Sequence, residues 1–416
     1  MRVDFLSGES GGDLVARCAA ASGGRLVRLS GDAAEGAGPD DLLGDWQELL
    51  DAQRGGTRYN SPRRFAAGAA AARPDGRQPL AALFSADGRA RAVIVGALRP
   101  GDAWHGAGPL ARLLPGLNCL TIPQTGIVTD GSAEAVAAVV GCLDTLLRGH
   151  VLQRVEIDNL ATGGALHRAL EQGPGAAFGL VRRDHVRFCR RLRDPQTGEP
   201  VQVNSGKTRQ GLRRKQRNLR DQFGGDLEFV QVTSPDRTDW FAQNAARIVA
   251  QTYQAALGIG VRDDPAMRSY LHDLATEGVL RGYLFLGQGA PVAYVLGDLE
   301  NGVFNLWATS FLPDYAQFSP GVVLLNQVFE ELTAEGAELF DFGHGDADYK
   351  RRLGDVELRQ ESLRIYGPGA VPHTAFLVHV GSDGLRDRMR GALVRSGRLD
   401  QARKFWRTCL RRAGRI

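Results

Sequence analysis

Four side chains able to move protons or stabilise charge gather in one glycine-punctuated loop, residues 343–350. The apolar stretch 339–342 before the loop predicts a buried strand. Gly343 and Gly345 allow positive φ angles or a close approach of the backbone to a ligand. Proteins of the α/β class place their chemistry at such exits from strands. The loop is therefore the candidate active site, and its functional side chains are His344, Asp346, Tyr349 and Lys350.

These side chains suit a direct group transfer, in which an acceptor loses a proton, an oxyanion forms and a leaving group is protonated. Asp346 is the candidate for binding a substrate amine or for acting as general base, directly or through water. Tyr349 suits the acid that protonates the leaving group, and Lys350 offers its charge or its peptide N–H to the oxyanion. His344 is the alternative base. The structural alternatives are that Asp346 caps a helix beginning at Ala347, that Tyr349 is a core residue, and that His344 and Lys350 are solvated.

A basic segment forms a second candidate site. Seven basic residues and no acid lie between Lys207 and Arg220, where a helix is expected. Arg209, Arg213 and Arg217 recur every four residues, so they lie mainly on one helical face. With Lys207, this face is suited to clamp a phosphate-bearing acceptor, a nucleotide-linked sugar or tRNA. The alternative is a solvated face, which would normally mix charges of both signs.

The candidate active-site loop belongs to a longer pattern. Residues 341–354 read Asp-Phe-Gly-x-Gly-Asp-x-x-Tyr-Lys-x-x-x-Gly, and they follow Ser-Pro-Gly-Val-Val-Leu-Leu at 319–325 and the basic segment 206–219. These three motifs together resemble the signature of the CelD-like (BcsL) acetyltransferases, a branch of the GNAT superfamily. The resemblance covers roughly residues 40–366 and is strongest from residue 204 onward.

Members of that family are similar in architecture to the Fem-type peptidoglycan aminoacyltransferases, which have two GNAT-like halves in tandem. In the Fem-type enzymes a Phe-Lys-x-x-x-Gly stretch supports the oxyanion. The comparable place is occupied here by 349–354, which reads Tyr-Lys-Arg-Arg-Leu-Gly. The resemblance implies an acyl transfer without a metal and without a covalent enzyme intermediate.

The resemblance also implies a place for the acyl donor. GNAT enzymes bind the pyrophosphate of coenzyme A on backbone N–H groups at the start of the helix after the fourth strand, where donors are unpaired and the helix dipole is positive. The usual phosphate loop is richer in Arg and Gly, so a capped helix start, with Ser as N-cap and Pro at the first helical position, is the alternative. Aminoacyl-tRNA is the alternative donor. The residues at this place are Phe318, Ser319, Gly321 and Val322.

The order of expected elements repeats along the chain. The first half contains strands over 80–85 and 91–98, a helix over 132–147 and a strand over 151–157. The second half contains a helix over 239–257, strands over 282–287, 290–299 and 303–309, a helix over 322–335 and a strand over 338–342. We expect an α/β (α+β) fold with tandem GNAT-like halves, each a mixed, mostly antiparallel central sheet flanked by helices. The expected domains are an N-terminal element (1–38), a first half (39–195), a catalytic half (196–366) and a basic helical tail (367–416).

Composition agrees with a folded enzyme. The chain has 416 residues, 43% hydrophobic and 24% charged, so it can bury a sizeable core. No apolar run approaches the roughly 20 residues that span a bilayer, and the N-terminus lacks the apolar core of a secretory signal, so a cytoplasmic location is expected. Five cysteines without C-x-x-C spacing suggest neither a disulfide framework nor a zinc site.

Two further features bear on the acceptor and on partners. Tyr294, Asn305 and Trp307 lie on neighbouring expected strands and are candidates for the wall of an acceptor pocket, with ordinary sheet residues as the alternative. Arginine dominates the expected C-terminal helix over 385–410. That tail is a candidate for contact with an anionic membrane surface or nucleic acid, or for packing on its own domain.

The sequence predicts an acyltransferase that moves an acetyl or other acyl group from acyl-CoA, such as acetyl-CoA, to an amine or hydroxyl of a saccharide or small metabolite. Its active site is expected in the second half. The first alternative is a Fem-like aminoacyltransferase that uses aminoacyl-tRNA and forms an amide bond. The second alternative is a non-catalytic module that binds an anionic glycan or nucleic acid.

Overall fold

The chain divides into two compact units, which are described separately. A computed structural model describes residues 1–8, 13–29, 38–53, 56–57, 59–70, 76–105, 107, 113–201, 206–256, 258–345 and 347–396. Unit 1 contains Met1–His185 and Arg359–Gly391, and unit 2 contains Val186–Leu358. Two long strands, β8 (Gly179–Arg191) and β14 (Val356–Tyr366), each run from one unit into the other.

Unit 1 is built around a mixed sheet with the strand order β2-β1-β3-β4-β5-β7-β14. The pairs β1–β2 and β5–β7 are parallel, and the other neighbours are antiparallel. The strands are β1 (Arg2–Ser7), β2 (Arg25–Arg28), β3 (Gln78–Ala86), β4 (Arg89–Asp102), β5 (Leu117–Ile122), β6 (Ile127–Thr129) and β7 (Arg154–Ala161). The helices are α1 (Asp13–Ala21), α2 (Pro39–Gln53), α3 (Pro62–Ala70), α4 (Ala133–Arg148), α5 (Ala165–Leu170) and most of α12 (Ala370–Arg395).

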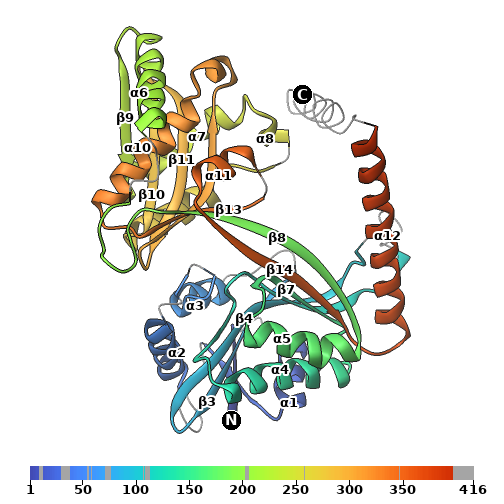
Figure 1. Cartoon of the computed structure of the whole chain (residues 1–416). Coiled ribbons are helices and arrows are strands. Elements are labelled where there is room, and N and C mark those ends of the chain that lie inside the picture. The colour runs from blue at the N-terminus through green and yellow to red at the C-terminus, as the bar shows by residue number, and fades with distance from the viewer. Residues whose placement is uncertain are drawn as a thin grey trace. The chain divides into compact units, whose positions relative to one another are not determined.

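Helices cover both faces of the sheet in unit 1 (Figure 1). One apolar cluster joins α1 and α4 to one face, and another joins α2 and α3 to the other face. Trp46 and Leu50 of α2 are buried in the second cluster. Ser132 caps α4 by accepting a hydrogen bond from the Ala135 N–H at 3.2 Å.

Unit 2 is built around hydrogen-bonded strands of mixed direction, with the order β8-β13-β12-β11-β10-β9. Only β12–β13 is parallel among these pairs of described strands. The strands are β9 (Leu227–Val232), β10 (Leu280–Gly287), β11 (Ala290–Glu300), β12 (Val303–Phe311) and β13 (Leu339–His344). The helices are α6 (Gly206–Asp221), α7 (Thr238–Val249), α8 (Tyr253–Ala256), α9 (Pro265–Thr276), α10 (Pro320–Ala334) and α11 (Asp348–Leu353).

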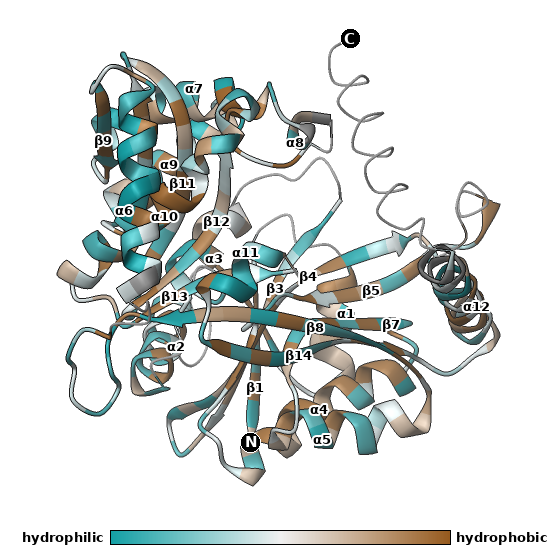
Figure 2. Ribbon diagram, turned by 45° about the horizontal axis from the view of Figure 1, so that its top comes forward, coloured by the Kyte–Doolittle hydropathy of each residue, from teal (hydrophilic) through white to brown (hydrophobic). Residues whose placement is uncertain are grey.

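The sheet of unit 2 also lies between two helical layers. One apolar cluster contains side chains of α6 and α10, and the cluster on the opposite face contains side chains of α7 and α9. Figure 2 shows α6 as largely hydrophilic, so few of its side chains attach it to the unit. Leu219 and, just after the helix, Phe223 are buried, and a Cβ at Gly287 would lie 2.4 Å from the Phe223 ring. Glycine at 287 therefore lets α6 approach the sheet closely.

Both units confirm the expected fold class, an α/β arrangement of mixed, mostly antiparallel sheets flanked by helices. The order of elements also repeats. Unit 1 contains β3, β4, β5, α4 and β7, and unit 2 contains β10, β11, β12, α10 and β13. In each case the helix connects two strands that pair in parallel. The two units thus share a repeat of topology, as the repeated order of expected elements predicted.

Two expected elements differ from those observed. The single helix expected over 239–257 is observed as two helices, α7, which ends at Val249, and the short α8. The Thr252 hydroxyl donates to the Val249 carbonyl at the break between them. The strand expected over 151–157 begins later, at Arg154, because the N–H groups of Val151 and Leu152 donate to the Leu146 carbonyl and complete the last turn after α4. Local hydrogen bonds at helix ends thus shifted both boundaries.

None of the helices in the described part of the chain has the length and apolar character needed to cross a membrane. Four cysteines, Cys18, Cys119, Cys142 and Cys189, are buried free thiols. The helix expected over 385–410 is described only as far as residue 396, so the rest of it lies outside the described residues.

A buried histidine connects α12 to the sheet of unit 1. His379 is 3% exposed, its Nδ1 lies 2.9 Å from the Tyr366 hydroxyl, and its Nε2 lies 3.3 Å from the Asp383 carboxylate. Burial is the main reason that the pKa of His379 is lowered from 6.5 to about 4, although Asp383 opposes the shift. The positive groups that lower it further are Arg364, His105 and Arg154.

This histidine should make the stability of unit 1 depend on pH. The unfolded chain binds the His379 proton near pH 6.5, whereas the folded protein binds it only near pH 4. The free energy of unfolding should therefore fall by up to about 3 kcal/mol as the pH is lowered from 6.5 to 4. His379→Gln, which cannot titrate, should flatten that slope in urea denaturation. His373→Gln removes an exposed histidine from the same helix and serves as control; an unchanged slope in His379→Gln would contradict the assignment.

Candidate active site

The parallel strands β12 and β13 diverge in unit 2. They pair at Val303–Leu339, Phe304–Phe340 and Asn305–Asp341, and then β12 continues to Phe311 and β13 to His344 with no further pairing recorded between these described strands. In unit 1 the corresponding pair, β5–β7, stays paired through the last residue of β5. The strand edges that face the divergence therefore have backbone groups that a ligand can use.

The first turn of α10 follows the diverging end of β12. Ser319 precedes it in a left-handed conformation, with φ +55° and ψ +49°, and its side chain does not cap the helix. The Ser319 hydroxyl instead lies 3.3 Å from the Lys215 ammonium of α6. Pro320 has no N–H, so Gly321 is the first residue of α10 that can donate one. Phe318, Ser319, Gly321 and Val322 are all half-buried. This turn combines a helix N-terminus with a cation, as an anion site requires.

The candidate loop takes the backbone form that its glycines predicted. Gly343 has φ +68° and Gly345 has φ +102°. Asp346, the first candidate base, lies outside the described residues. His344 and Tyr349 are half-buried, and the Tyr349 ring meets the Phe342 ring edge-on, with centroids 6.2 Å apart. The Tyr349 ring is therefore packed on β13, and both side chains remain partly exposed.

Lys350 is buried, not solvated. It is 8% exposed, and its ammonium donates to the carbonyls of Gly343, at 3.2 Å, and His344, at 2.6 Å. Its peptide N–H donates to the Ala347 carbonyl at 2.9 Å, so of the two oxyanion donors expected at Lys350 only the ammonium remains. Burial lowers the pKa of Lys350, and the nearby carboxylate of Asp341 opposes this shift. The ammonium thus fixes the loop where β13 ends.

A buried carboxylate that the sequence analysis left without a role lies beside this lysine. Asp341 is 3% exposed and forms an ion pair with Arg187 of β8. It also accepts hydrogen bonds from the Cys189 thiol, at 3.7 Å, and from the Gly343 N–H, at 2.9 Å. Burial, with Asp341 nearby, raises the pKa of Cys189 to about 12, so this thiol stays protonated and can donate. Asp341 therefore orders the last residues of β13.

A second buried carboxylate gathers two of the expected acceptor-wall residues. Asp298 of β11 is fully buried and accepts hydrogen bonds from the Trp307 indole N–H and, at 2.9 Å, from the Asn305 amide. The Trp307 ring stacks on Tyr270 of α9, with centroids 5.4 Å apart. Tyr294, the third expected wall residue, is fully buried in the core against α7 and α9, and burial raises its pKa to about 12. Asn305 and Trp307 thus lie together, whereas Tyr294 is a core residue.

Trp307→Phe should reduce stability through this arrangement. The substitution keeps an aromatic ring for stacking but removes the N–H donated to buried Asp298. Losing a hydrogen bond to a buried charged acceptor costs about 2 kcal/mol, so the urea midpoint should fall accordingly. Tyr270→Phe keeps the stacked ring and is the control. A Trp307→Phe protein as stable as the wild type would contradict this role.

The basic helix forms as α6, and its predicted residues separate into groups. Arg209, Arg213 and Arg217 are exposed, and the Lys207 side chain lies outside the described residues. Arg209 and Arg213 line a cavity of about 570 Å³ beside α10, whereas Arg217 is not among its lining residues. Lys215, which the sequence analysis did not single out, contacts Ser319. Its position inside the basic segment was the available signal.

Comparison with known proteins identifies the domain that carries these features. Residues 206–351 match the family model described as an acetyltransferase (GNAT) domain. All of the matched residues lie in unit 2, and they are the part of the chain that resembles a GNAT domain. The match begins at α6 and ends inside α11, so the matched residues include the divergence of β12 and β13, the start of α10 and the candidate loop. A GNAT domain supports acyltransferase activity.

Solved structures with a similar fold include L-PGS from Bacillus licheniformis, which is 14% identical over 84% of this chain and 98% of that chain, with a TM-score of 0.45. FemX is 11% identical over 69% of this chain and 88% of that chain, with a TM-score of 0.48. A tandem GNAT protein from the clavulanic acid biosynthesis pathway is 14% identical over 80% of this chain and 97% of that chain, with a TM-score of 0.42. With identities of 14% or less and TM-scores below 0.5, these similarities do not indicate the substrates of this protein. No curated protein matched the sequence.

Proposed function

We propose that the protein transfers an acetyl or other acyl group from acyl-CoA to an amine or hydroxyl of a saccharide or small metabolite, as a CelD-like branch of the GNAT superfamily would. The observation that carries this proposal is the divergence of β12 and β13 in the GNAT domain, next to the uncapped start of α10. The described residues of unit 1 show no such divergence, because β5 and β7 stay paired to the end of β5, so we assign the donor site to unit 2.

The residues at the divergence fit the chemical parts of an acyl-CoA. The Gly321 N–H and the Lys215 ammonium suit its pyrophosphate, because a helix N-terminus and a cation both favour phosphate. The strand edges of β12 and β13 suit the amide groups of its pantetheine arm, which can pair as an added strand does. Bound there, an acyl-CoA supplies an activated thioester carbonyl.

The candidate loop would supply the proton transfers. Tyr349 is our candidate for protonating the leaving thiolate, and Asp346 or His344 is our candidate for taking the acceptor's proton. The Lys350 ammonium has three donors, of which the Gly343 and His344 carbonyls take two. We assign the third donor to the oxyanion.

The acceptor would be held from two sides of the GNAT domain. Asn305 and Trp307, fixed by Asp298, are our candidates for contact with its uncharged part. Our candidates for any phosphate that it carries are Lys207, Arg209, Arg213 and Arg217 of α6.

The exposed basic face of α6 also favours a second candidate function, Fem-like transfer from aminoacyl-tRNA with amide-bond formation. An extended cationic surface suits a nucleic-acid backbone. In that case acyl transfer would depend on tRNA and would weaken steeply as salt is raised, whereas transfer from acyl-CoA would not need tRNA.

An acceptor screen tests these proposals. Purified protein is incubated with acetyl-CoA and a panel of amino sugars, amines and hydroxylated saccharides, and release of free thiol is followed. We expect release that depends on an acceptor and is lost in Asp346→Ala/Lys350→Ala. Transfer from aminoacyl-tRNA, with none from any acyl-CoA, would establish the second candidate function in place of the first.

A further inference from the structure

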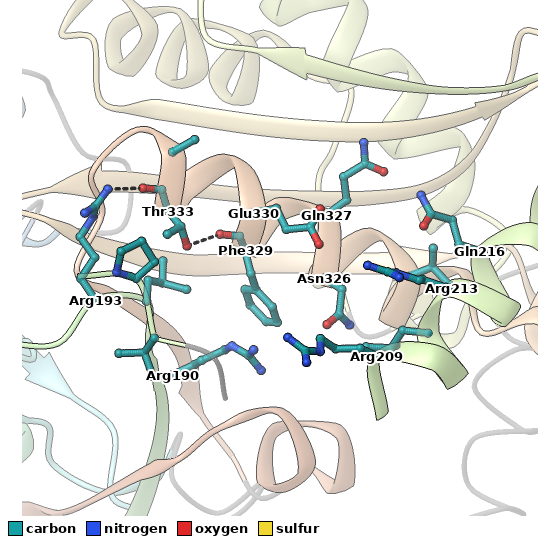
Figure 3. A pocket seen from close by; sticks show the side chains of 16 residues that line it. Arg190, Arg193, Arg209, Arg213, Gln216, Asn326, Gln327, Phe329, Glu330 and Thr333 are labelled. Carbon is teal, nitrogen blue, oxygen red and sulfur yellow. Dashed lines mark hydrogen bonds between the residues drawn. The ribbon is translucent and has the colours of Figure 1, made fainter. Parts of the chain in front are cut away.

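A cavity of about 570 Å³ lies in unit 2 between α6, α10 and the end of β8. None of its lining residues belongs to the turn 317–322 or to the loop 343–350, but Arg209 and Arg213 are also our candidates for a phosphate of the acceptor, so the inference below rests on that part of the proposed function and deepens it. Figure 3 shows side chains that enter it from all three elements. The lining residues used below are Arg190, Arg193, Arg209, Arg213, Asn326 and Phe329.

The inner end of the cavity carries a buried guanidinium. Arg190 is 6% exposed, its Nη1 donates to the Leu353 carbonyl at 3.1 Å, and its guanidinium lies 4.5 Å from the centre of the Phe329 ring. None of the ion pairs recorded among the described residues includes Arg190. Burial lowers the pKa of Arg190, and the nearby carboxylate of Asp355 opposes this shift. A buried guanidinium outside any close ion pair is costly unless further hydrogen bonds or an anion compensate it.

More cations converge on the same space. Figure 3 shows the Arg190 and Arg209 side chains directed toward each other from opposite walls, with Arg213 on the α6 side. Arg193 lines the cavity as well, and its guanidinium donates to the Gly198 and Thr333 carbonyls. The single carboxylate among the described lining residues is the exposed Glu330. An anion held between these guanidinium groups would offset their mutual repulsion and accept their hydrogen bonds.

We propose that this cavity binds the phosphate group of a small phosphorylated molecule. Arg190 would hold the phosphate from the buried end, and Arg209 and Arg213 would close on it from α6, because guanidinium forks match phosphate oxygens in pairs. The Asn326 amide lies beside this charge and suits hydroxyls of the same ligand. The cavity volume lies in the range of small-molecule sites. A nucleic-acid backbone lying on the surface of α6 would not reach Arg190.

Calorimetric titration with inorganic phosphate and pyrophosphate, at constant ionic strength, tests the proposal on the full chain. We expect saturable binding to the wild type. Arg190→Gln and Arg213→Gln should each weaken it by about tenfold or more, the usual effect of losing a hydrogen bond to a charged partner. Arg214→Gln, which removes an exposed arginine of α6 that does not line the cavity, should bind as the wild type does.

A further variant separates this cavity from the start of α10. Lys215→Gln removes the cation beside Ser319 and should leave phosphate binding to the cavity intact. No saturable binding to the wild type would overturn the proposal, and so would binding that is lost in Lys215→Gln but retained in Arg213→Gln. Arg213 is exposed, so its substitution tests the site even if Arg190→Gln fails to fold.

Discussion

Lys350→Met should lower the rate of acyl transfer by about 100-fold. Methionine keeps the length of the side chain but donates no hydrogen bond, so the Gly343 and His344 carbonyls lose the donor that holds the loop at the end of β13. A 100-fold loss corresponds to about 2.7 kcal/mol of transition-state free energy, which is the scale of one hydrogen bond to a charged group. Initial rates at saturating donor and acceptor measure this loss.

The matched control is on the same short helix. Arg352→Met removes an exposed cation whose ion pair, with Asp348, is also exposed and therefore contributes little. It should retain the wild-type rate. Lys350→Met should also lower the free energy of unfolding, by about 2 kcal/mol, because two partly buried carbonyls lose a partner. A Lys350→Met enzyme with the wild-type rate would contradict the role given to this ammonium.

Gly321→Val should weaken acetyl-CoA binding by about 100-fold. Gly321 is the first residue of α10 with an N–H to offer, and a Cβ there would lie 3.1 Å from the Phe311 ring. A valine side chain would crowd that ring and obstruct the N-terminus of α10, where the pyrophosphate is proposed to bind. Losing one or two charge-assisted hydrogen bonds to the pyrophosphate corresponds to about 3 kcal/mol. Calorimetric titration gives the dissociation constant directly.

Gly211→Ala is the control for changing a helical glycine. A Cβ at Gly211 would meet nothing within 4 Å, so this variant should bind acetyl-CoA normally and gain about 0.5–1 kcal/mol of stability. If Gly321→Val and Gly211→Ala bind the donor equally well, the start of α10 is not the donor site.

The elements that position the site were largely predictable because their patterns are local. The apolar residues of β13 and α10, and the glycines of the candidate loop, each carry a signal within a few residues. β8 carries no such signal, because charged residues occupy many of its positions. Its sequence, Gly-Leu-Val-Arg-Arg-Asp-His-Val-Arg-Phe-Cys-Arg-Arg, resembles a surface segment even though it pairs with β13.

The partners inside the site could not be predicted, because they are distant in sequence. Arg187 lies 154 residues from Asp341, and no local pattern connects them. The burial of Lys350 was unforeseen for a related reason, since its acceptors are backbone carbonyls, which every residue carries. Asp298 did carry a local signal, because it is a carboxylate that follows a run of apolar residues within the strand β11.

Titration of acetyl-CoA into the wild-type protein tests the central claim most directly. The account predicts saturable binding with one site per chain, competed by free coenzyme A and weakened in Gly321→Val and Lys215→Gln. Binding that Gly321→Val and Lys215→Gln both weaken would place the donor at the divergence of β12 and β13. Absence of binding by acetyl-CoA, longer acyl-CoAs and free coenzyme A alike, in protein that is folded by its thermal transition, would contradict the account.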